Sequence, residues 1–376
     1  MAASVTLHDV AARAGVHFST ASRVLNGQGN VAAATRERIL QAARDLDFVP
    51  NAQARLFARG TSSTFGVLTL HAAETFALPT FAGASLALGA RDIAMLHYDA
   101  SADPSALERI TTRMRSRQIE ALLVLGAGPD QPLQVQTSGL RVPVAFAYAI
   151  SGNRKEPSFV TDGIGAGRMV ADHLLDLGRS RFAHVTTTDS MAARQRQKGF
   201  VDRLRERGAT MTIARALRGD WSRGWGEEAG RRLLPRLGRL DAIFCGNDQI
   251  AIGLETVLVR HGVRVPDDIA LVGYDNMEGR GWRGDKYPRR QHLTTIEPRL
   301  GEIGRRAVEA LVAATEGTAP LPRGPQPVPG ELIVGETTGA PASGAGRDQP
   351  ADSWSGRPGD SGSVRPAGSG SEKSST

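Results

Sequence analysis

The segment from Val5 to Asn26, VTLHDVAARAGVHFSTASRVLN, constrains the amino-terminal fold more strongly than any other stretch of the chain. Two short apolar patterns at helical spacing, Leu7 to Ala14 and Ala21 to Leu25, are separated by Gly15. A helix, a glycine turn and a second helix predict a helix-turn-helix, whose second helix lies in the DNA major groove. Two surface helices of an ordinary domain are the alternative interpretation.

The side chains that the second helical pattern turns outward favour the DNA-binding interpretation. They are short polar groups, one arginine and one aromatic: His17, Phe18, Ser19, Ser22 and Arg23. Such groups suit base edges and phosphates better than a protein core.

The residues around this segment complete a small amino-terminal domain. Thr6 is the expected N-cap of the first helix. A third helix, from near Ala33 to Leu46, closes a helical domain over residues 1–49. Residues 50–64 then form a hinge and linker, in which 52–58 (AQARLFA) can be helical. That run is too short to be helical alone in water, so it should order only on a partner. A loose linker is the alternative.

From Phe65 the sequence alternates between short apolar runs and amphipathic stretches. Strands are predicted at 65–71, 93–98, 120–125, 143–148, 158–161, 182–187, 242–245, 269–274, 293–296 and 331–335. Helices are predicted at 104–117, 166–178, 191–207, 224–236, 249–262 and 299–315. This alternation predicts an α/β fold with parallel sheets and helices on both faces.

The strands divide near residue 161 into two similar runs, which favours two lobes over one wide sheet. The expected core spans 65–339, with lobes of about 65–161 plus 293–320, and 162–292 plus 330–339. A ligand would bind between the lobes, at the carboxyl ends of the strands. Residues 340–376 are rich in Gly, Ser, Pro and Ala and should be a disordered tail.

Composition narrows the possible partners and compartment. The 376-residue chain has a formal net charge of +7, and residues 1–60 hold seven arginines against four acids. A basic end module fits a polyanion such as DNA. Cys245 is the only cysteine, so no intrachain disulfide can form and a reducing cytoplasm is expected. We find no signal segment and no apolar run of membrane-spanning length, and therefore expect no membrane partner.

Several longer motifs resemble the LacI/GalR family of bacterial transcription regulators, over about residues 5 to 339. In the amino-terminal part these are VTLHDVAARAGV, SRVLNG, NVAAATRERIL and VPNAQAR. In the core they are VTDGIGAGRMVADHLLDLG, AARQRQKGF, AIFCGNDQIAIGL, VRVPDDIALVGYDN and LTTIEP. The resemblance implies a helix-turn-helix head on a two-lobed, periplasmic-binding-protein-like core. It also implies a homodimer, a repressor, that binds a pseudopalindromic double-stranded operator under control of a small effector, most often a sugar or glycoside.

By resemblance, the DNA contacts fall in the head and hinge. Phe18, Ser19 and Arg23 match base-reading positions, where Arg23 can donate to guanine O6 and N7 and Phe18 can pack on a thymine methyl. The positions that match phosphate contacts are Thr6, Thr20, Ser22, Asn26 and Thr35. His17 replaces a small hydroxyl residue, which leaves open whether it caps the helix or touches DNA. For Ser22 and Asn26, capping is the alternative.

The resemblance also places the hinge run in the minor groove. There an apolar wedge can part a base step when two copies meet. Phe57 stands where the family commonly has leucine, beside Leu56, and Asn51 precedes them as a further expected DNA contact. Disorder of this run without DNA would supply a switch, because moving the lobes pulls the two hinge segments apart.

The expected effector contacts come from both lobes. Arg196, Asn247 and Asp275 match the family's polar ligand contacts, and together they offer the donors and acceptors that sugar diols need. Three further positions complete the predicted site: Phe76, Asp162 and Trp221. Structural roles for Asn247 and Asp275, and plain core roles for Trp221 and Phe76, are the alternatives.

Residues 276–292, NMEGRGWRGDKYPRRQH, form a longer and more basic loop than the family usually has. A solvated loop is one interpretation. The other is a border of the ligand pocket that favours an anionic or larger glycosidic effector. The tail carries no leucine heptads, so a dimer is expected rather than a tetramer held by a helical bundle.

Two rival functions remain at this point. Gly163 to Gly167 (GIGAG) follows a strand, but its spacing is not that of a dinucleotide fingerprint, and nucleophile-elbow, P-loop and zinc-protease motifs are absent. We therefore expect no enzyme, no cofactor and no metal. The second rival is a two-lobed sugar-binding protein without a role in DNA regulation.

Overall fold

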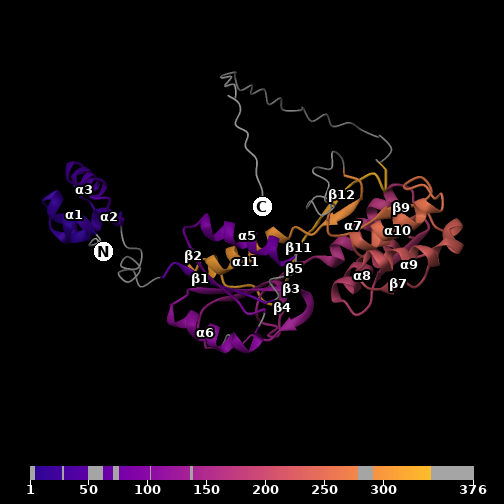
Figure 1. Ribbon diagram of the computed structural model, residues 1–376, viewed down its shortest axis with the longest axis horizontal. Helices are drawn as coiled ribbons and strands as arrows, with labels where there is room; N and C mark the ends of the chain where they lie inside the picture. The colour runs from indigo at the N-terminus through magenta and orange to yellow at the C-terminus, as the bar shows by residue number, and fades with distance from the viewer. Residues whose placement is uncertain are drawn as a thin grey trace, which may run out of the picture. The chain divides into compact units, whose positions relative to one another are not determined.

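The computed structural model describes residues 5–27, 29–49, 62–70, 76–101, 103–135, 139–277 and 291–339. Within these residues, helices come first and are followed by alternating strands and helices (Figure 1). The predicted α/β class with a helical amino-terminal part is confirmed. The expected hinge contacts Asn51, Leu56 and Phe57, most of the basic loop, and the tail lie outside the described residues.

Three helices pack into the amino-terminal domain, which we call the head. They are α1 (Leu7–Ala14), α2 (Phe18–Leu25) and α3 (Ala33–Asp45). Thr6 begins α1 as predicted, because its hydroxyl accepts the Asp9 amide and the Asp9 carboxylate accepts the Thr6 amide at 2.8 Å. Gly15 ends α1 at φ 60°, a conformation that glycine adopts without steric cost. The small core contains Val10, Ala11, Ala14, Ala21, Val24, Ile39, Ala42 and Ala43.

The first lobe of the core, the N-lobe, is built on a parallel sheet with the order β11-β5-β4-β3-β1-β2. Its strands are β1 (Thr64–Thr69), β2 (Ala94–Asp99), β3 (Ala121–Leu133), β4 (Val144–Ser151), β5 (Ser158–Thr161) and β11 (Pro325–Val328). Its α-helices are α5 (Ala77–Gly89) and α11 (Leu300–Thr315) on one face, and α6 (Leu107–Ser116) on the other. A short 3-10 turn, η1 (Pro104–Ala106), leads into α6.

The second lobe, the C-lobe, has a parallel sheet with the order β7-β6-β8-β9. Its strands are β6 (Phe182–Thr187), β7 (Leu217–Gly219), β8 (Ala242–Cys245) and β9 (Ala270–Val272). Helices α7 (Gly163–Asp176) and α8 (Met191–Glu206) cover one face, and α9 (Arg223–Leu233) and α10 (Asp248–Arg260) cover the other. The remaining elements are η2 (Leu234–Arg239) and the antiparallel pair β10 (Thr295–Glu297) and β12 (Glu331–Ile333).

Three elements were not predicted from the sequence. Helix α5 is apolar on almost every side, with Leu78 and Leu86 exposed and Leu88 buried, so it shows no amphipathic period. Strand β7 has only three residues. Strand β11 (PQPV) contains two prolines, which remove ladder donors and are tolerated because this strand lies at the sheet edge.

Glycines bring the helices of each covering pair into backbone contact. A Cβ on Gly83 of α5 would overlap the carbonyl oxygen of Gly301 on α11. In the same way, Gly167 of α7 meets the Arg196 carbonyl of α8, and Gly226 of α9 meets the Ile250 carbonyl of α10. Gly167 belongs to the GIGAG run, which therefore serves helix packing in this fold. None of the helices in the described parts of the chain is long and apolar enough to cross a membrane.

Gly167→Ala should therefore destabilise the C-lobe. The added methyl group must push α8 away from α7, and overpacking of this kind costs about 1–3 kcal/mol. Urea denaturation at equilibrium measures the loss. Gly89→Ala is the matched control, because Gly89 is helical with open space around its Cβ position and the change should be neutral or stabilising. A Gly167→Ala protein as stable as the wild type would contradict this packing argument.

His184 should make the fold sensitive to acid. It is fully buried on β6 beside Phe200 and Phe244, and burial lowers its pKa from 6.5 to about 4. Between these values the unfolded chain binds a proton that the folded chain does not. The free energy of unfolding therefore decreases as the pH is lowered, by about 1.4 kcal/mol per pH unit. His184→Gln removes this component. Unfolding free energies of both proteins between pH 7 and 4.5 check it, and equal pH slopes would contradict it.

Candidate DNA-binding face and ligand site

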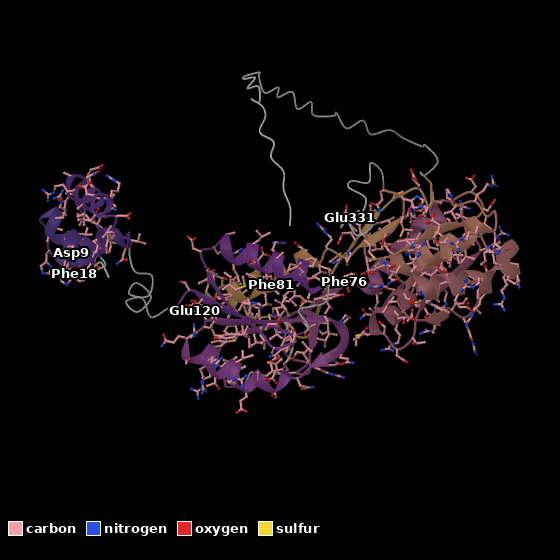
Figure 2. All side chains as sticks on the ribbon, viewed as in Figure 1. Asp9, Phe18, Phe76, Phe81, Glu120 and Glu331 are labelled. Atoms are coloured by element: carbon pink, nitrogen blue, oxygen red, sulfur yellow. The ribbon has the colours of Figure 1, made fainter. Side chains whose placement is uncertain are left out.

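Helix α2 divides into a buried and an exposed side. Ala21 and Val24 are buried in the core of the head, whereas Phe18, Ser19 and Arg23 are exposed. Phe18 keeps 39% of its surface exposed, an unusual state for a large aromatic side chain on a small domain (Figure 2). The exposed side therefore carries the three residues that were predicted to read bases.

The exposed side chains of α2 are held by local contacts. His17 caps the helix, because its Nδ1 accepts the Ser19 amide at 3.3 Å, which answers the question that the sequence left open about a cap. The Phe18 ring stacks on His8 of α1 with ring centroids 4.4 Å apart. The Arg23 Nε donates to the Ser19 carbonyl at 3.2 Å. Within the described residues no hydrogen bond occupies the terminal nitrogens of Arg23, so these donors face outward.

The predicted phosphate-contacting residues differ in exposure. Thr6 is exposed, while Thr20, Ser22, Asn26 and Thr35 are partly buried. The Asn26 amide donates to the Ser22 hydroxyl at 3.3 Å, and Asn26 is the C-cap of α2. These two side chains thus have a structural role in the head, as the alternative interpretation held.

The predicted ligand residues of the C-lobe follow the carboxyl ends of neighbouring strands. Trp221 follows β7, Asn247 follows β8 and Asp275 follows β9. Asp162 follows β5 of the N-lobe, where the chain crosses to α7. Because the carboxyl ends of parallel strands share one sheet edge, the segments after β7, β8 and β9 converge. Arg196 reaches the same edge from α8.

Arg196 is the centre of this group. It is buried, with 7% of its surface exposed, and its Nη1 donates to the Gly246 carbonyl at 2.5 Å. Its Nη2 lies 3.9 Å from the Asp275 carboxylate, and its guanidinium lies 5.4 Å from the Trp221 ring centroid. The Arg196 Nε is buried without a hydrogen-bond partner in the described structure. A buried donor of this kind is costly unless a ligand satisfies it.

Asn247 and Asp162 are also used by the fold. The Asn247 side chain caps α10 by accepting the Ile250 amide at 2.9 Å and donates to the Trp221 carbonyl at 3.0 Å. The Asp162 carboxylate caps α7 by accepting the Gly165 amide at 2.7 Å. The structural alternative for Asn247 therefore has direct support, and the structure described here shows one of its two amide hydrogens in a hydrogen bond, the one to Trp221.

The other two predicted residues have different settings. Asp275 is buried at φ 109°, a strained conformation outside glycine, and strain of this kind concentrates at binding sites. Phe76 stands at the beginning of α5 and packs against the apolar cluster of the N-lobe (Figure 2).

Tyr274 is a site residue that sequence reasoning missed. The carbon of the Arg196 guanidinium lies over its ring, 3.3 Å from the ring centroid. Burial raises the pKa of this phenol. An aromatic residue directly after a buried strand is usually predicted to be part of the hydrophobic core. The only feature of the sequence that pointed to a site role for Tyr274 is its position next to Asp275.

A carboxylate of the N-lobe caps the helix that carries Arg196. Asp130 lies in the carboxyl-terminal part of β3, and its Oδ1 accepts hydrogen bonds from the amides of Met191 at 2.7 Å and Ala192 at 3.2 Å. The Ser190 hydroxyl donates to the same oxygen at 3.1 Å. A negative charge at this helix end is favourable because the free amides and the helix dipole are positive there. The two lobes are therefore coupled through α8.

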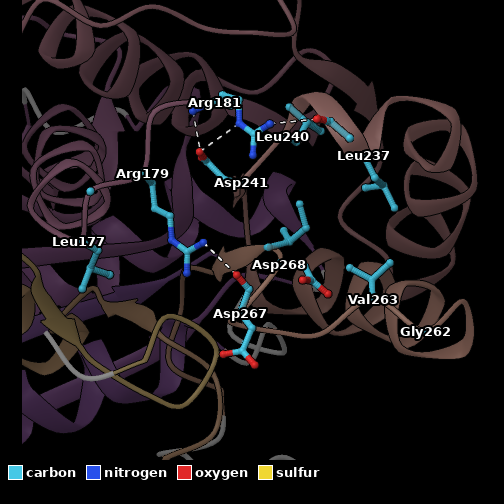
Figure 3. Close-up of a pocket in the computed structure, with 13 residues that line it drawn as sticks. Leu177, Arg179, Arg181, Leu237, Leu240, Asp241, Gly262, Val263, Asp267 and Asp268 are labelled. Carbon is cyan, nitrogen blue, oxygen red and sulfur yellow. Dashed lines mark hydrogen bonds and ion pairs between the residues drawn. The ribbon is translucent and has the colours of Figure 1, made fainter. Parts of the chain in front are cut away.

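A separate hollow of about 620 Å³ lies at the opposite, amino-terminal edge of the C-lobe sheet (Figure 3). Its arginines have partners within the C-lobe: Arg181 pairs with Asp241 at 3.3 Å, and Arg179 donates to the Pro266 carbonyl at 2.7 Å. This hollow lies away from the predicted ligand residues. The described residues contain no cluster of three or more His, Cys, Asp or Glu side chains that could hold a metal.

Comparison with known protein families gives two matches. Residues 6–51 match the family described as bacterial regulatory proteins, lacI family, and residues 171–338 match a periplasmic binding protein-like domain. The first match covers the head, and the second covers most of the C-lobe together with α11 and β11 of the N-lobe.

Individual relatives span nearly the whole core. The HTH-type transcriptional regulator CelR of Thermobifida fusca is 33% identical over 278 residues, which are 72% of this chain and 82% of CelR. A crystal structure of the lac repressor dimer bound to operator and the anti-inducer ONPF has a TM-score of 0.66 and 27% identity, covering 90% of this chain and all of that one. A CelR–cellobiose complex has a TM-score of 0.57 and 26% identity, covering 89% of this chain and 99% of that one. The chain thus belongs to the lacI family of bacterial regulatory proteins and is a DNA-binding transcription regulator.

Proposed function

We propose that the protein is a repressor that binds a pseudopalindromic operator as a homodimer and is controlled by a carbohydrate-like effector. The observation that carries the DNA-binding part is the exposed side of α2, where Ser19 and Arg23 stand opposite the buried Ala21 and Val24. A helix in this setting can enter the major groove and present donors to base edges. The relative whose structure contains operator DNA supports this reading.

The effector would bind at the carboxyl ends of the C-lobe strands. The unsatisfied Nε of Arg196, the Asp275 carboxylate and the Trp221 ring offer a donor, an acceptor and an apolar face. This combination suits a polyhydroxylated ring, whose diols need paired polar contacts and whose C–H face packs on aromatics. The CelR structure that contains cellobiose supports a carbohydrate.

Coupling between ligand and DNA would pass through the lobes. A ligand that binds Arg196 would contact α8 directly. The first turn of α8 is capped by Asp130 of the N-lobe, so the same helix contacts both the ligand and the other lobe. The N-lobe is in turn the lobe that the chain enters from the head. Ligand binding that favours one arrangement of the lobes therefore shifts the population of heads able to bind the operator.

We further infer a role in binding rather than catalysis, in the bacterial cytoplasm where operator DNA is found. Cys245 fits this reading, because burial in β8 raises the pKa of its thiol well above its ordinary value and disfavours the nucleophilic thiolate. A sugar-binding protein without DNA regulation is the competing function. Sequencing of genomic fragments retained by the purified protein separates the two. One enriched pseudopalindrome supports the repressor, and salt-sensitive binding without sequence enrichment supports the competitor.

Arg23→Ala should weaken binding to the cognate operator by about 1–3 kcal/mol and relax one base preference, because a bidentate contact to guanine is lost. Fluorescence anisotropy on cognate and scrambled duplexes measures both effects. Arg44→Ala is the control, since Arg44 is an exposed arginine on α3 that bonds Gln41. If affinity for the two duplexes fell equally, Arg23 would be a phosphate contact instead.

Asp275→Asn should leave operator affinity nearly unchanged and weaken the effector response at least tenfold. The amide keeps the size of the side chain but removes the charge that faces Arg196 and the strong acceptor for sugar hydroxyls. Operator release titrated against a panel of mono- and disaccharides is the measurement. Asp202→Asn, on the exposed side of α8, is the matched control. Undiminished effector sensitivity would remove Asp275 from the ligand site.

A further inference from the structure

The amino-terminal ends of the N-lobe strands all lie on one edge of the sheet. Every strand pair described in this sheet is parallel, so the segments that precede the strands meet there. The chain enters the N-lobe at the same edge, through Ser62 and Ser63 in front of β1. Figure 2 shows Glu120, which begins the approach to β3, and Phe76 at opposite ends of this lobe.

This edge carries a set of exposed basic side chains, which we call the basic edge. It comprises Arg115 and Arg117 before β3, Arg141 before β4, Arg154 and Lys155 before β5, and Arg323 before β11. No ion pair joins any of these six to an acid of the described residues. Arg141, Lys155 and Arg323 also line one hollow of about 370 Å³, so they gather on a common surface.

The acids near the basic edge form no ion pair with its six cations in the described structure, although Glu156 lines the same hollow. Glu120 accepts the amides of Ser62 and Ser63, the latter at 2.8 Å, and Glu156 accepts the Ser151 hydroxyl at 2.5 Å. Asp92 and Glu316 are the other acids there, and both are exposed.

Two further arginines add to the positive charge. Arg113 is exposed in the last turn of α6, and Arg91, in front of β2, pairs with Glu309 at 3.6 Å. With Glu309 included, the cations at this edge outnumber the acids by eight to five.

The hollow of the C-lobe in Figure 3 offers a comparison, because an arginine there forms an ion pair with an acid. There Arg181 is paired with Asp241. Arg264, which is not one of the residues that line the hollow, pairs with Asp268 at 2.6 Å. The basic edge has no such pairing, so its charge is available to an outside anion.

The linker between the head and the N-lobe limits how far the basic edge can lie from DNA that the head has bound. Only the residues between Val49 of the head and Ser62 connect the two parts, and a fully extended chain of that length reaches roughly 45 Å at most. When the head is in the major groove, the basic edge is the part of the N-lobe tethered to that DNA. Exposed arginines that lie close to the duplex can contact its densely spaced phosphates.

We propose that the basic edge is a second DNA-binding surface, which contacts phosphates of the duplex that the head has bound. The inference rests on the proposed operator binding and adds a contact made by the core itself. Arg117, Arg141 and Arg323 would act as point charges toward the backbone, without reading sequence. The core would thereby raise the affinity of the regulator for DNA and leave its choice of site to α2.

Salt titration of the full-length protein tests this proposal. Each phosphate contact contributes roughly 0.9 to the slope of log K against log salt concentration. The combined variant Arg117→Gln, Arg141→Gln, Arg323→Gln should lower the slope by at least one and weaken binding about tenfold or more at roughly 0.15 M salt. Cognate and scrambled duplexes should weaken by the same factor.

Two further variants control for folding and for net charge. Arg117→Lys, Arg141→Lys, Arg323→Lys retains the charges and should retain the wild-type slope. Arg215→Gln, Arg236→Gln, Arg239→Gln removes three exposed arginines of the C-lobe, which no described acid pairs, and should also retain it. An unchanged slope in the first variant, or an equal fall in the C-lobe variant, would overturn the proposal.

The proposed function fails differently. If the wild-type protein does not select one duplex over a scrambled one, operator binding itself is wrong. If the wild type selects its operator and the basic-edge variant matches it in affinity and salt slope, only the second surface is wrong.

Discussion

A buried guanidinium organises the ligand end of the core. A charge that leaves water must be compensated by hydrogen bonds, opposite charge or an aromatic face, and Arg196 uses all three. Its compensation comes from Gly246, Tyr274 and Asp275, which follow two neighbouring strands. The burial of one side chain thus fixes the strand ends relative to α8, and the Arg196 Nε, which has no partner among the described residues, is the donor that the proposed effector would satisfy.

The two edges of the parallel sheets have different roles. Carboxyl ends of the strands collect short polar segments that can bind a small molecule, whereas amino ends of the N-lobe strands receive the chain from the head. The proposed ligand site therefore lies at the carboxyl ends of the strands, whereas the chain from the head enters at the amino ends of the N-lobe strands. Between them lies Asp130, whose hydrogen bonds to the first turn of α8 make the lobes depend on each other.

Much of this organisation could be predicted from local patterns. The strands at 158–161, 182–187 and 242–245 were placed at their observed bounds, because buried parallel strands are short apolar runs between turn residues. Capping by Thr6 followed from its place before an apolar repeat. Contacts between residues distant in sequence could not be predicted: Arg196 stacks on Tyr274, 78 positions away. Helix α5 could not be predicted either, because its outward side is apolar as well and the helix therefore has no amphipathic period.

The glycine contacts between covering helices have a consequence for genetics. At Gly83, Gly167 and Gly226 even a methyl group would overlap the backbone of the neighbouring helix. Helix packing, and not sugar or DNA binding, therefore favours glycine at these positions. A screen for loss of repression would recover such alleles beside true operator-contact alleles and give both the same phenotype. Protein abundance in the mutant cells, rather than the strength of the phenotype, tells the two classes apart.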